Sequence, residues 1–164
     1  MGRLIALVLL GLLAGCVSTT RFRAASDRPS ASAPSSAPKK VQEDALRRAA
    51  DEWLNVPYRF GGESRQGIDC SGLTCRIYRE VYGIELPRTV ELQIQAGRFV
   101  QKARLQPGDL LFFRTGGSSA VDHVGIYLGQ GRFVHASLQR GVVISELGAR
   151  YYQRRYVTAR RILP

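Results

Sequence analysis

Between residues 42 and 54, apolar side chains recur at intervals of three and four positions. Leu46, Ala50 and Trp53 fall on one side of a helix built from this segment. Because residues three or four apart lie on the same face of an α-helix, the pattern predicts an amphipathic helix whose apolar side covers a core.

A second helix is predicted over residues 68–83. Its apolar residues, four positions apart, are Leu73, Ile77 and Val81. Asp69 suits the N-cap position, where a carboxylate accepts a hydrogen bond from the first helical turn. Gly83 is the residue type that most often ends a helix.

Further along the chain, a third helix is predicted after Pro87, ending at Gly97, and strands are predicted from about Asp109 onward. Residues 123–128 and 132–137 flank the sequence Gly-Gln-Gly and predict a β-hairpin. We expect a three-residue loop, because such loops favour a residue with positive φ near their end, and glycine adopts it freely.

The loop length decides which side chains of the hairpin share a face. With three loop residues, Tyr127 pairs with Phe133, and Gly125 pairs with His135. His123 and His135 are then diagonal neighbours on one face of the sheet. A two-residue loop would shift the register by one position and separate the histidines onto opposite faces.

The N-terminus reads as an export signal. A positive start is followed by ten apolar residues, 4–13, which are too few to span a bilayer comfortably. The run ends in Leu-Ala-Gly-Cys, which resembles the bacterial lipobox. We therefore predict a signal peptide at residues 1–15 and a lipid on Cys16; an ordinary signal peptide that contains a cysteine is the alternative. The residue after this cysteine is Val17 and not Asp, which by resemblance to Gram-negative sorting signals favours the inner leaflet of the outer membrane.

Residues 16–40 are rich in Ser, Ala and Pro and have too few large apolar side chains to form a core. We expect a flexible tether of roughly 25–30 Å on average. Residues 41–164 then form the one folded domain, which we expect to be monomeric.

The formal charge of the chain is +11. Residues 41–164 hold 18 Lys and Arg against 12 Asp and Glu, and these charges are dispersed. Nucleic-acid binding is not expected, because no basic block stands beside an aromatic cluster. Acidic peptides, cell-wall polymers or anionic lipids suit this charge better. Cysteine and histidine do not occur at zinc-ligand spacing, so we expect no metal.

Cys70 and Cys75 point about 140° apart on the predicted helix, so we expect no disulfide between them. Cys70 falls in the first helical turn, where free backbone N–H groups and a partial positive charge lower the pKa of a thiol. Cys70 is therefore the candidate nucleophile, whereas Cys75, one turn further on, is expected to be structural.

A cysteine hydrolase needs a thiol, an imidazole base and a third polar group that orients the base. Cys70, His123 and His135 supply these three groups, with His123 as base and His135 as orienter; the residues alone also permit the reverse. The backbone N–H of Cys70 can stabilise an oxyanion. Tyr58 is a second candidate donor, or else a core aromatic residue.

These residues belong to motifs by which the chain resembles the NlpC-type family of papain-like murein endopeptidases. The matching segments are residues 57–62, 68–72, 86–89, 107–113, 123–129 and 133–137. The resemblance implies a circularly permuted papain-like α+β domain with helices packed on an antiparallel sheet. It also implies that Cys70 is the nucleophile, His123 the base and His135 its orienter.

The resemblance places further residues near the nucleophile, where they shape substrate binding: Tyr58, Asp69, Ser71 and Arg88. Arg88 is the weaker candidate, because Pro87-Arg88 also suits the start of a helix.

The implied substrate is a murein stem peptide, and no cofactor is implied. In the small Gram-negative lipoproteins of the family, the implied bond joins D-alanine to diaminopimelate; elsewhere it joins γ-D-glutamate to diaminopimelate. We expect a lipid-anchored enzyme at the periplasmic face of the outer membrane. A non-catalytic cell-wall-binding module and a hydrolase or acyltransferase acting on lipid-linked amides are the alternatives.

Overall fold

The computed structural model describes residues 38–117 and 119–164. The predicted signal peptide, Cys16 and most of the predicted linker lie outside these residues. The helices are α1 (Lys39–Trp53), α2 (Cys70–Tyr82), α3 (Val90–Gln93) and α4 (Arg150–Arg155), with a 3-10 turn at Lys102–Arg104. In the described residues, no helix is long and apolar enough to cross a membrane.

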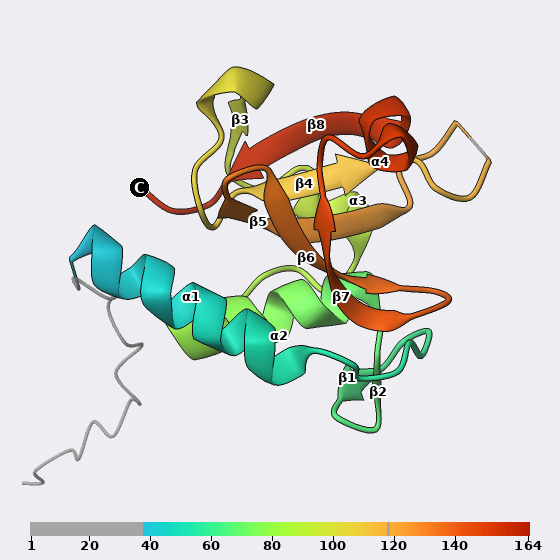
Figure 1. The fold of residues 1–164 in the computed structure, drawn as a ribbon, viewed down its shortest axis with the longest axis horizontal. Coiled ribbons are helices and arrows are strands. Elements are labelled where there is room, and N and C mark those ends of the chain that lie inside the picture. Colours follow the sequence, from blue (N-terminus) through green and yellow to red (C-terminus); the bar gives the residue numbers. More distant parts are fainter. Residues whose placement is uncertain (1–37, 118) are drawn as a thin grey trace, which may run out of the picture. The chain divides into compact units, whose positions relative to one another are not determined.

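A six-stranded antiparallel sheet has the strand order β3-β8-β4-β5-β6-β7 (Figure 1). Its strands are β3 (Arg98–Val100), β4 (Leu110–Phe113), β5 (His123–Gly129), β6 (Arg132–Ser137), β7 (Gly141–Glu146) and β8 (Tyr156–Arg161). A small separate hairpin joins β1 (Glu63–Ser64) to β2 (Gly67–Ile68). The predicted α+β architecture, with helices packed on an antiparallel sheet, is confirmed.

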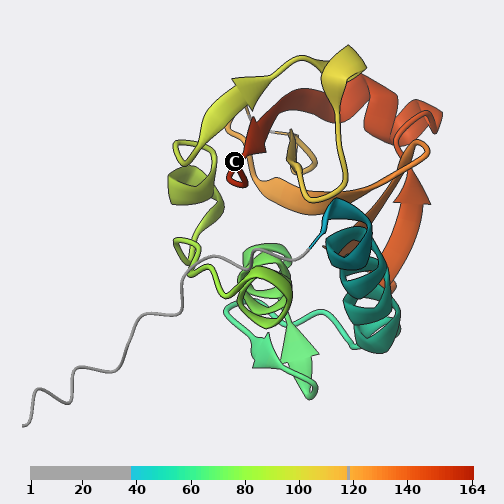
Figure 2. The same ribbon diagram turned by 90° about the vertical axis from the view of Figure 1, so that its left-hand side faces the viewer.

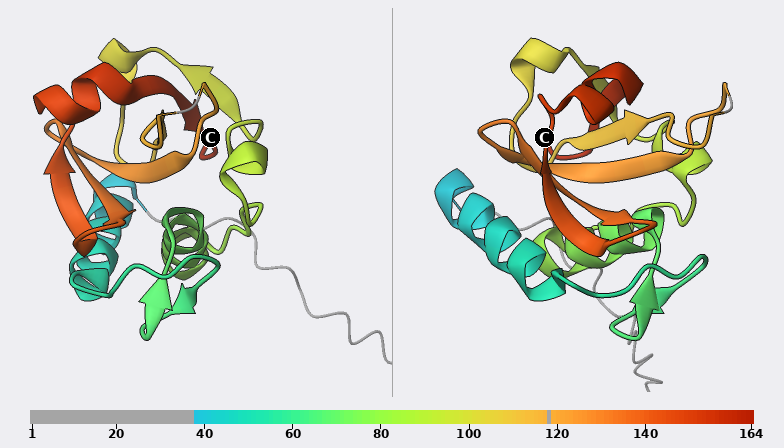
Figure 3. Two further views of the ribbon diagram at one scale, coloured as in Figure 1. Left: turned by 90° about the vertical axis from the view of Figure 1, so that its right-hand side faces the viewer. Right: turned by 45° about the vertical axis from the view of Figure 1, so that its right-hand side comes forward.

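Helices α1 and α2 lie side by side against one face of the curved sheet (Figures 2 and 3). Leu46 and Ala50 of α1 are completely buried there, as the helical pattern predicts. The boundaries of α2 also follow the prediction. The Asp69 carboxylate accepts a hydrogen bond of 2.6 Å from the Gly72 N–H, and Gly83 ends the helix with a φ of 66°.

The opposite face of the sheet carries a second core, against which α4 contributes Tyr152. Strand β4 supplies both cores: Leu110 and Phe112 face the helices α1 and α2, while Leu111 and Phe113 face the second core. Successive residues of a strand point to opposite faces, so a strand covered on both sides is apolar throughout.

The third predicted helix is much shorter than expected, because α3 ends at Gln93 and Gly97 lies in a bend that leads into β3. Arg98 pairs with Arg161 of β8, so sheet formation takes the residues that would have lengthened the helix. A four-residue helix has little stability of its own and yields to such tertiary contacts.

The hairpin between β5 and β6 corrects the predicted loop. Gly129 pairs with Arg132, which leaves a two-residue turn in which Gln130 and Gly131 both have positive φ. A register shift between Tyr127 and Gly129 inserts one extra residue in β5 and restores the predicted pairing of Tyr127 with Phe133. The face of each histidine is therefore as predicted, although the loop is not.

Candidate active site

Cys70 is the first residue of α2, where it lines a cleft of about 550 Å³. Tyr58, Asp69, Ser71 and Arg88, which the resemblance places near the nucleophile, all line the same cleft. Only 6% of the Cys70 surface is exposed, so the sulfur lies at the base of the cleft rather than at its rim.

The thiol of Cys70 is not preset as a thiolate. Burial raises its pKa to about 11, and hydrogen bonds from the backbone of Val124 and Ser71 lower it only in part. Loss of water around a thiolate here outweighs the helix N-terminus. The N–H groups at the start of α2 lower the pKa of this thiol as predicted, but the low pKa that we expected for Cys70 is not found, because burial outweighs them.

The two histidines face each other across the hairpin. His123 Nε2 lies 2.9 Å from His135 Nδ1, and the rings meet edge to face. His135 Nε2 lies 3.0 Å from both Ser145 Oγ of β7 and Tyr152 Oη of α4. A chain of hydrogen bonds thus runs from His123 to two hydroxyl groups, and only Nδ1 of His123 is left to face a reacting group.

Aromatic packing fixes the orientation of this chain. The His135 ring stacks on Phe133 at 4.9 Å and meets the Tyr152 ring edge-on at 5.2 Å. Phe113 extends the cluster by stacking on Phe133. Burial lowers the pKa of His123 to about 4, and burial together with the charge of His123 lowers that of His135 to about 3. Both rings are therefore neutral at physiological pH.

Cys70 packs in the core between the helices and the sheet, whereas the histidines belong to the face that carries α4. Within residues 38–117 and 119–164, no hydrogen bond joins the Cys70 thiol to the His123 ring. The thiol instead receives a hydrogen bond from the N–H of Val124, the residue that follows His123. The Cys70 thiol thus lies at the start of β5, against the residue that follows the candidate base His123.

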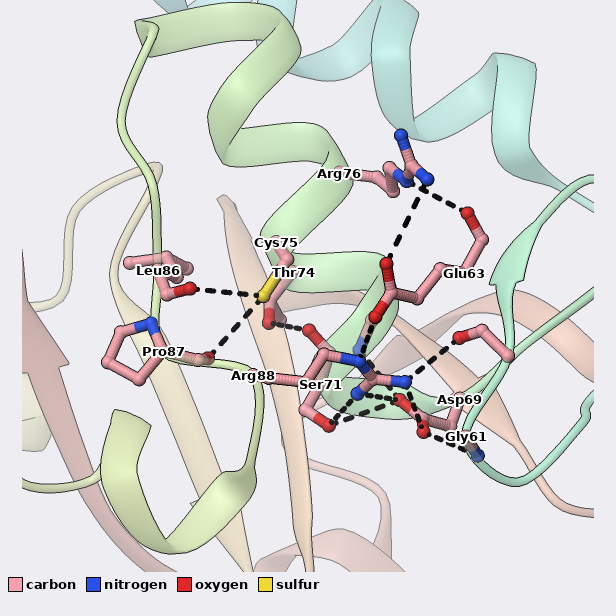
Figure 4. A network of polar contacts seen from close by, with 12 residues as sticks. Gly61, Glu63, Asp69, Ser71, Thr74, Cys75, Arg76, Leu86, Pro87 and Arg88 are labelled. Carbon is pink, nitrogen blue, oxygen red and sulfur yellow. Dashed lines mark hydrogen bonds and ion pairs between the residues drawn. The ribbon is translucent and has the colours of Figure 1, made fainter.

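An ion-pair network holds the start of α2 (Figure 4). The two oxygens of Asp69 accept five hydrogen bonds, from the N–H groups of Gly61 and Gly72, from the Ser71 hydroxyl and from both terminal nitrogens of Arg88. Burial pushes the pKa of Asp69 upward, but these bonds hold it below its usual value.

Arg88 is held as firmly as Asp69. Its guanidinium group also donates to Ser71 Oγ, to the Gly62 carbonyl oxygen and to the Glu63 carboxylate. Arg88 joins the loop before α3 to the β1–β2 hairpin and to the start of α2. It therefore shapes the cleft wall as a structural clamp.

Tyr58, the candidate oxyanion donor, lines the same cleft as Cys70. Burial raises the pKa of its phenol, and the nearby Cys70 and Asp69 add to the effect. The phenol thus keeps its proton at neutral pH and can donate it in a hydrogen bond.

Cys75 has a structural environment. Its sulfur donates to the carbonyl oxygens of Leu86 and Pro87, and the buried Gln93 side chain donates to the sulfur. Both Cys70 and Cys75 are free thiols, as predicted.

Sequence analysis missed three polar residues of the site. Ser145 and Tyr152 contact His135, and Asp122, which precedes His123, accepts hydrogen bonds from Thr115. Asp122 also lines the cleft of Cys70. The sequence could have singled out Asp122, because it directly precedes the candidate base His123. No local sequence pattern marks Ser145 or Tyr152. In the described residues, no group of three or more His, Cys, Asp and Glu could hold a metal ion.

Comparison with known proteins identifies the family of the chain. Residues 55–161 match the model of the NlpC/P60 family. The chain is 47% identical over 112 residues to the murein DD-endopeptidase MepS/murein LD-carboxypeptidase of Escherichia coli K12, which covers 68% of this chain and 58% of that protein. It is 43% identical over 121 residues to a probable endopeptidase NlpC homolog of Haemophilus influenzae, covering 74% and 63% respectively.

The match therefore spans less than two thirds of the length of these two relatives. The crystal structure of an NlpC/P60 family protein from Bacillus cereus superimposes with a TM-score of 0.69 at 40% identity, over 74% of this chain and 40% of that one. Sequence and fold lead to the same conclusion: this chain belongs to the NlpC/P60 family.

Proposed function

We propose that the protein is a murein endopeptidase that hydrolyses stem-peptide amide bonds, with Cys70 as nucleophile, His123 as base and His135 as its orienter. The observation that carries this proposal is the hydrogen-bonded chain from His123 through His135 to two hydroxyl groups, which begins beside the cleft of Cys70.

The chain is compatible with the tautomers that activity requires. For His123 Nδ1 to accept a proton, the neutral ring must carry its own proton on Nε2 and donate it to His135 Nδ1. His135 then carries its proton on Nε2 and donates it to Ser145 or Tyr152. The reverse polarity would leave His123 Nδ1 protonated and unable to act as a base.

In the reaction, the Cys70 proton passes to His123 Nδ1 while the sulfur attacks the amide carbon. In such an attack the thiol turns from the Val124 N–H toward the ring. The Cys70 N–H and the Tyr58 hydroxyl stabilise the oxyanion. His123 returns the proton to the leaving nitrogen as the C–N bond breaks, and water then hydrolyses the thioester. Asp69, Ser71 and Arg88 hold the cleft wall that receives the acyl part.

The bond we favour joins D-alanine to diaminopimelate, because the relative from Escherichia coli is named a DD-endopeptidase. Cleavage between γ-D-glutamate and diaminopimelate is the alternative. A non-catalytic wall-binding module is disfavoured, because Cys70, His123 and His135 are all present.

For the N-terminus we propose lipidation of Cys16 after removal of residues 1–15, which would anchor a monomeric domain at the periplasmic face of the outer membrane. The lipobox-like sequence supports this assignment. Radiolabelled palmitate incorporation that is lost in Cys16→Ala would test the anchor, and membrane fractionation would test its location.

The activity is tested by digesting purified sacculi with the full chain and with Cys70→Ala, and by identifying the released muropeptides by mass. We expect the wild type to convert cross-linked dimers into monomers and the variant to leave them intact. Equal release of products by both proteins would contradict the proposal. Fragments that begin with diaminopimelate would instead identify the γ-D-glutamyl bond.

A further inference from the structure

A second pocket, of about 360 Å³, is lined by both His123 and His135 but not by Cys70. Leu138 and Tyr151 form apolar parts of its wall, and both are exposed, Leu138 to 70%. Arg140, which follows in the turn between β6 and β7, also lines the pocket. Large exposed apolar side chains beside a cation suit a ligand that has an aliphatic stem and a negative charge.

The charges of this pocket differ from those of the Cys70 cleft. Arg140 lines the pocket and no carboxylate does. The cleft, by contrast, is lined by three carboxylates and a single cation: Asp69, Glu91, Asp122 and Arg88. In the part of the chain that the structure describes, no ion pair or hydrogen bond occupies the Arg140 guanidinium group. Its donors are therefore available to a ligand.

Two observations bring positive charge close to this pocket. Burial and the charge of His123 lower the pKa of His135 most, and Arg140 lowers it further. Arg155 lies over the Tyr151 ring at 3.9 Å and adds a second cation beside the pocket wall. A guanidinium group in this setting matches a carboxylate, with which it forms two parallel hydrogen bonds.

The position of the pocket indicates which part of a substrate enters it. The base that returns a proton to the leaving nitrogen must contact the leaving group, and His123 lines this pocket. Resting on the proposed function, we propose that Arg140 binds a free carboxylate on the leaving-group side of the scissile amide, within the pocket bounded by Leu138 and Tyr151.

This assignment bears on the choice of bond. In a D-alanyl cross-link, the scissile nitrogen is attached to the carbon of diaminopimelate that also carries a carboxylate. When γ-D-glutamyl diaminopimelate lies inside a longer stem, the corresponding carboxyl group is already part of the next amide. A carboxylate subsite therefore favours cleavage of the cross-link.

The test uses two synthetic peptides in which D-alanine is joined to the amine of diaminopimelate. One peptide carries the adjacent free carboxylate, and the other carries the carboxamide. We expect kcat/KM of the wild type to be about 10- to 100-fold higher for the carboxylate peptide, as expected for a charge-assisted bidentate pair. Arg140→Gln should bring this ratio close to one.

Arg154→Gln is the matched control, because Arg154 is an exposed residue of α4 that does not line the pocket. It should keep the wild-type ratio. An unchanged ratio in Arg140→Gln, or equal turnover of both peptides by the wild type, would overturn the assignment.

If the wild type cleaves neither peptide, the proposed function fails. The carboxylate subsite is then tested separately, by binding. Binding of both peptides is then measured by calorimetry with Cys70→Ala and with Cys70→Ala/Arg140→Gln. Tighter binding of the carboxylate peptide that is lost with Arg140 supports the subsite. Equal binding of the two peptides contradicts it.

Discussion

The proposed nucleophile and the proposed base are held in place by different physical means. Cys70 starts a helix whose first turn is fixed by the charged clamp of Asp69 and Arg88. His123 is fixed through His135, a neutral ring stacked among aromatic side chains. One side of the site relies on paired charges at a partly exposed surface, and the other relies on buried neutral rings.

Because of this difference, the two sides should fail under different conditions. Paired charges tolerate mild acid until the carboxylate itself is protonated, but they do not tolerate loss of one partner. Buried neutral imidazoles withstand changes in salt, but protonation disfavours their buried state. Each side can therefore be disturbed while the other stays intact.

The largest effect should come from mild acid, which acts on His123 and His135 but not on the clamp of Asp69 and Arg88. In the unfolded chain both imidazoles titrate near 6.5, whereas in the fold their pKa values are about 4 and about 3. Between these values the unfolded state binds more protons, so the free energy of unfolding falls as the pH falls. We expect a loss on the order of 4 kcal/mol between pH 7 and 4.5 in urea titrations.

The carboxylate of Asp69 has a lowered pKa, so its stabilising effect is lost only as the pH falls below about 4. His135→Phe, which keeps an aromatic ring on Phe133, should reduce the loss between pH 7 and 4.5 by about half, because only His123 then titrates. If the wild type were equally stable at both pH values, neutral buried histidines would be excluded.

Removing the charge of Arg88 should destabilise the clamp at the start of α2, where Cys70 lies. Arg88→Met leaves the Asp69 carboxylate, whose side chain is only 8% exposed, without its ionic partner. The expected loss is about 3 kcal/mol of unfolding free energy at pH 7. Arg79→Met is the control, because Arg79 pairs with Glu85 at the exposed surface, where an ion pair contributes little to stability. Equal losses in the two variants would show that the clamp has no special role.

A smaller effect should follow from removing the hydroxyl groups that contact His135. Because either hydroxyl can accept the Nε2 proton, Tyr152→Phe and Ser145→Ala should each lower kcat only about 3-fold. The double variant should lower kcat about 100-fold with little change in KM, since His135 is then free to adopt the wrong tautomer. Tyr156→Phe, in the same aromatic cluster, should leave kcat unchanged. Additive single effects would argue against a shared proton acceptor.

Local sequence signals predicted the parts of the site that depend on neighbours along the chain. Asp69 and Gly83 bound α2 as expected, because caps are set by residues within one turn. The face of the two histidines followed from strand alternation even though the turn was wrong. A bulge compensated for the shorter loop, and no local pattern distinguishes this combination from a three-residue loop.

Properties that arise from contacts between residues far apart in the sequence could not be predicted from local patterns. The pKa of Cys70 depends on how completely β5 covers the thiol, which the first turn of a helix does not reveal. Arg88 reaches Asp69 across 19 positions, and Tyr152 reaches His135 across 17. Such pairs are set by the packing of elements against each other.

We propose that Cys70 alone supplies the attacking sulfur, and the two free cysteines of the domain allow a direct test. Turnover of a purified cross-linked muropeptide is measured with the wild type, Cys70→Ala and Cys75→Ala at equal concentrations of folded protein. Cys70→Ala should reduce kcat/KM by about 10⁴-fold or more, and Cys75→Ala by no more than about 3-fold. If Cys70→Ala kept a tenth of the wild-type activity, or if Cys75→Ala were the inactive variant, the account would be wrong.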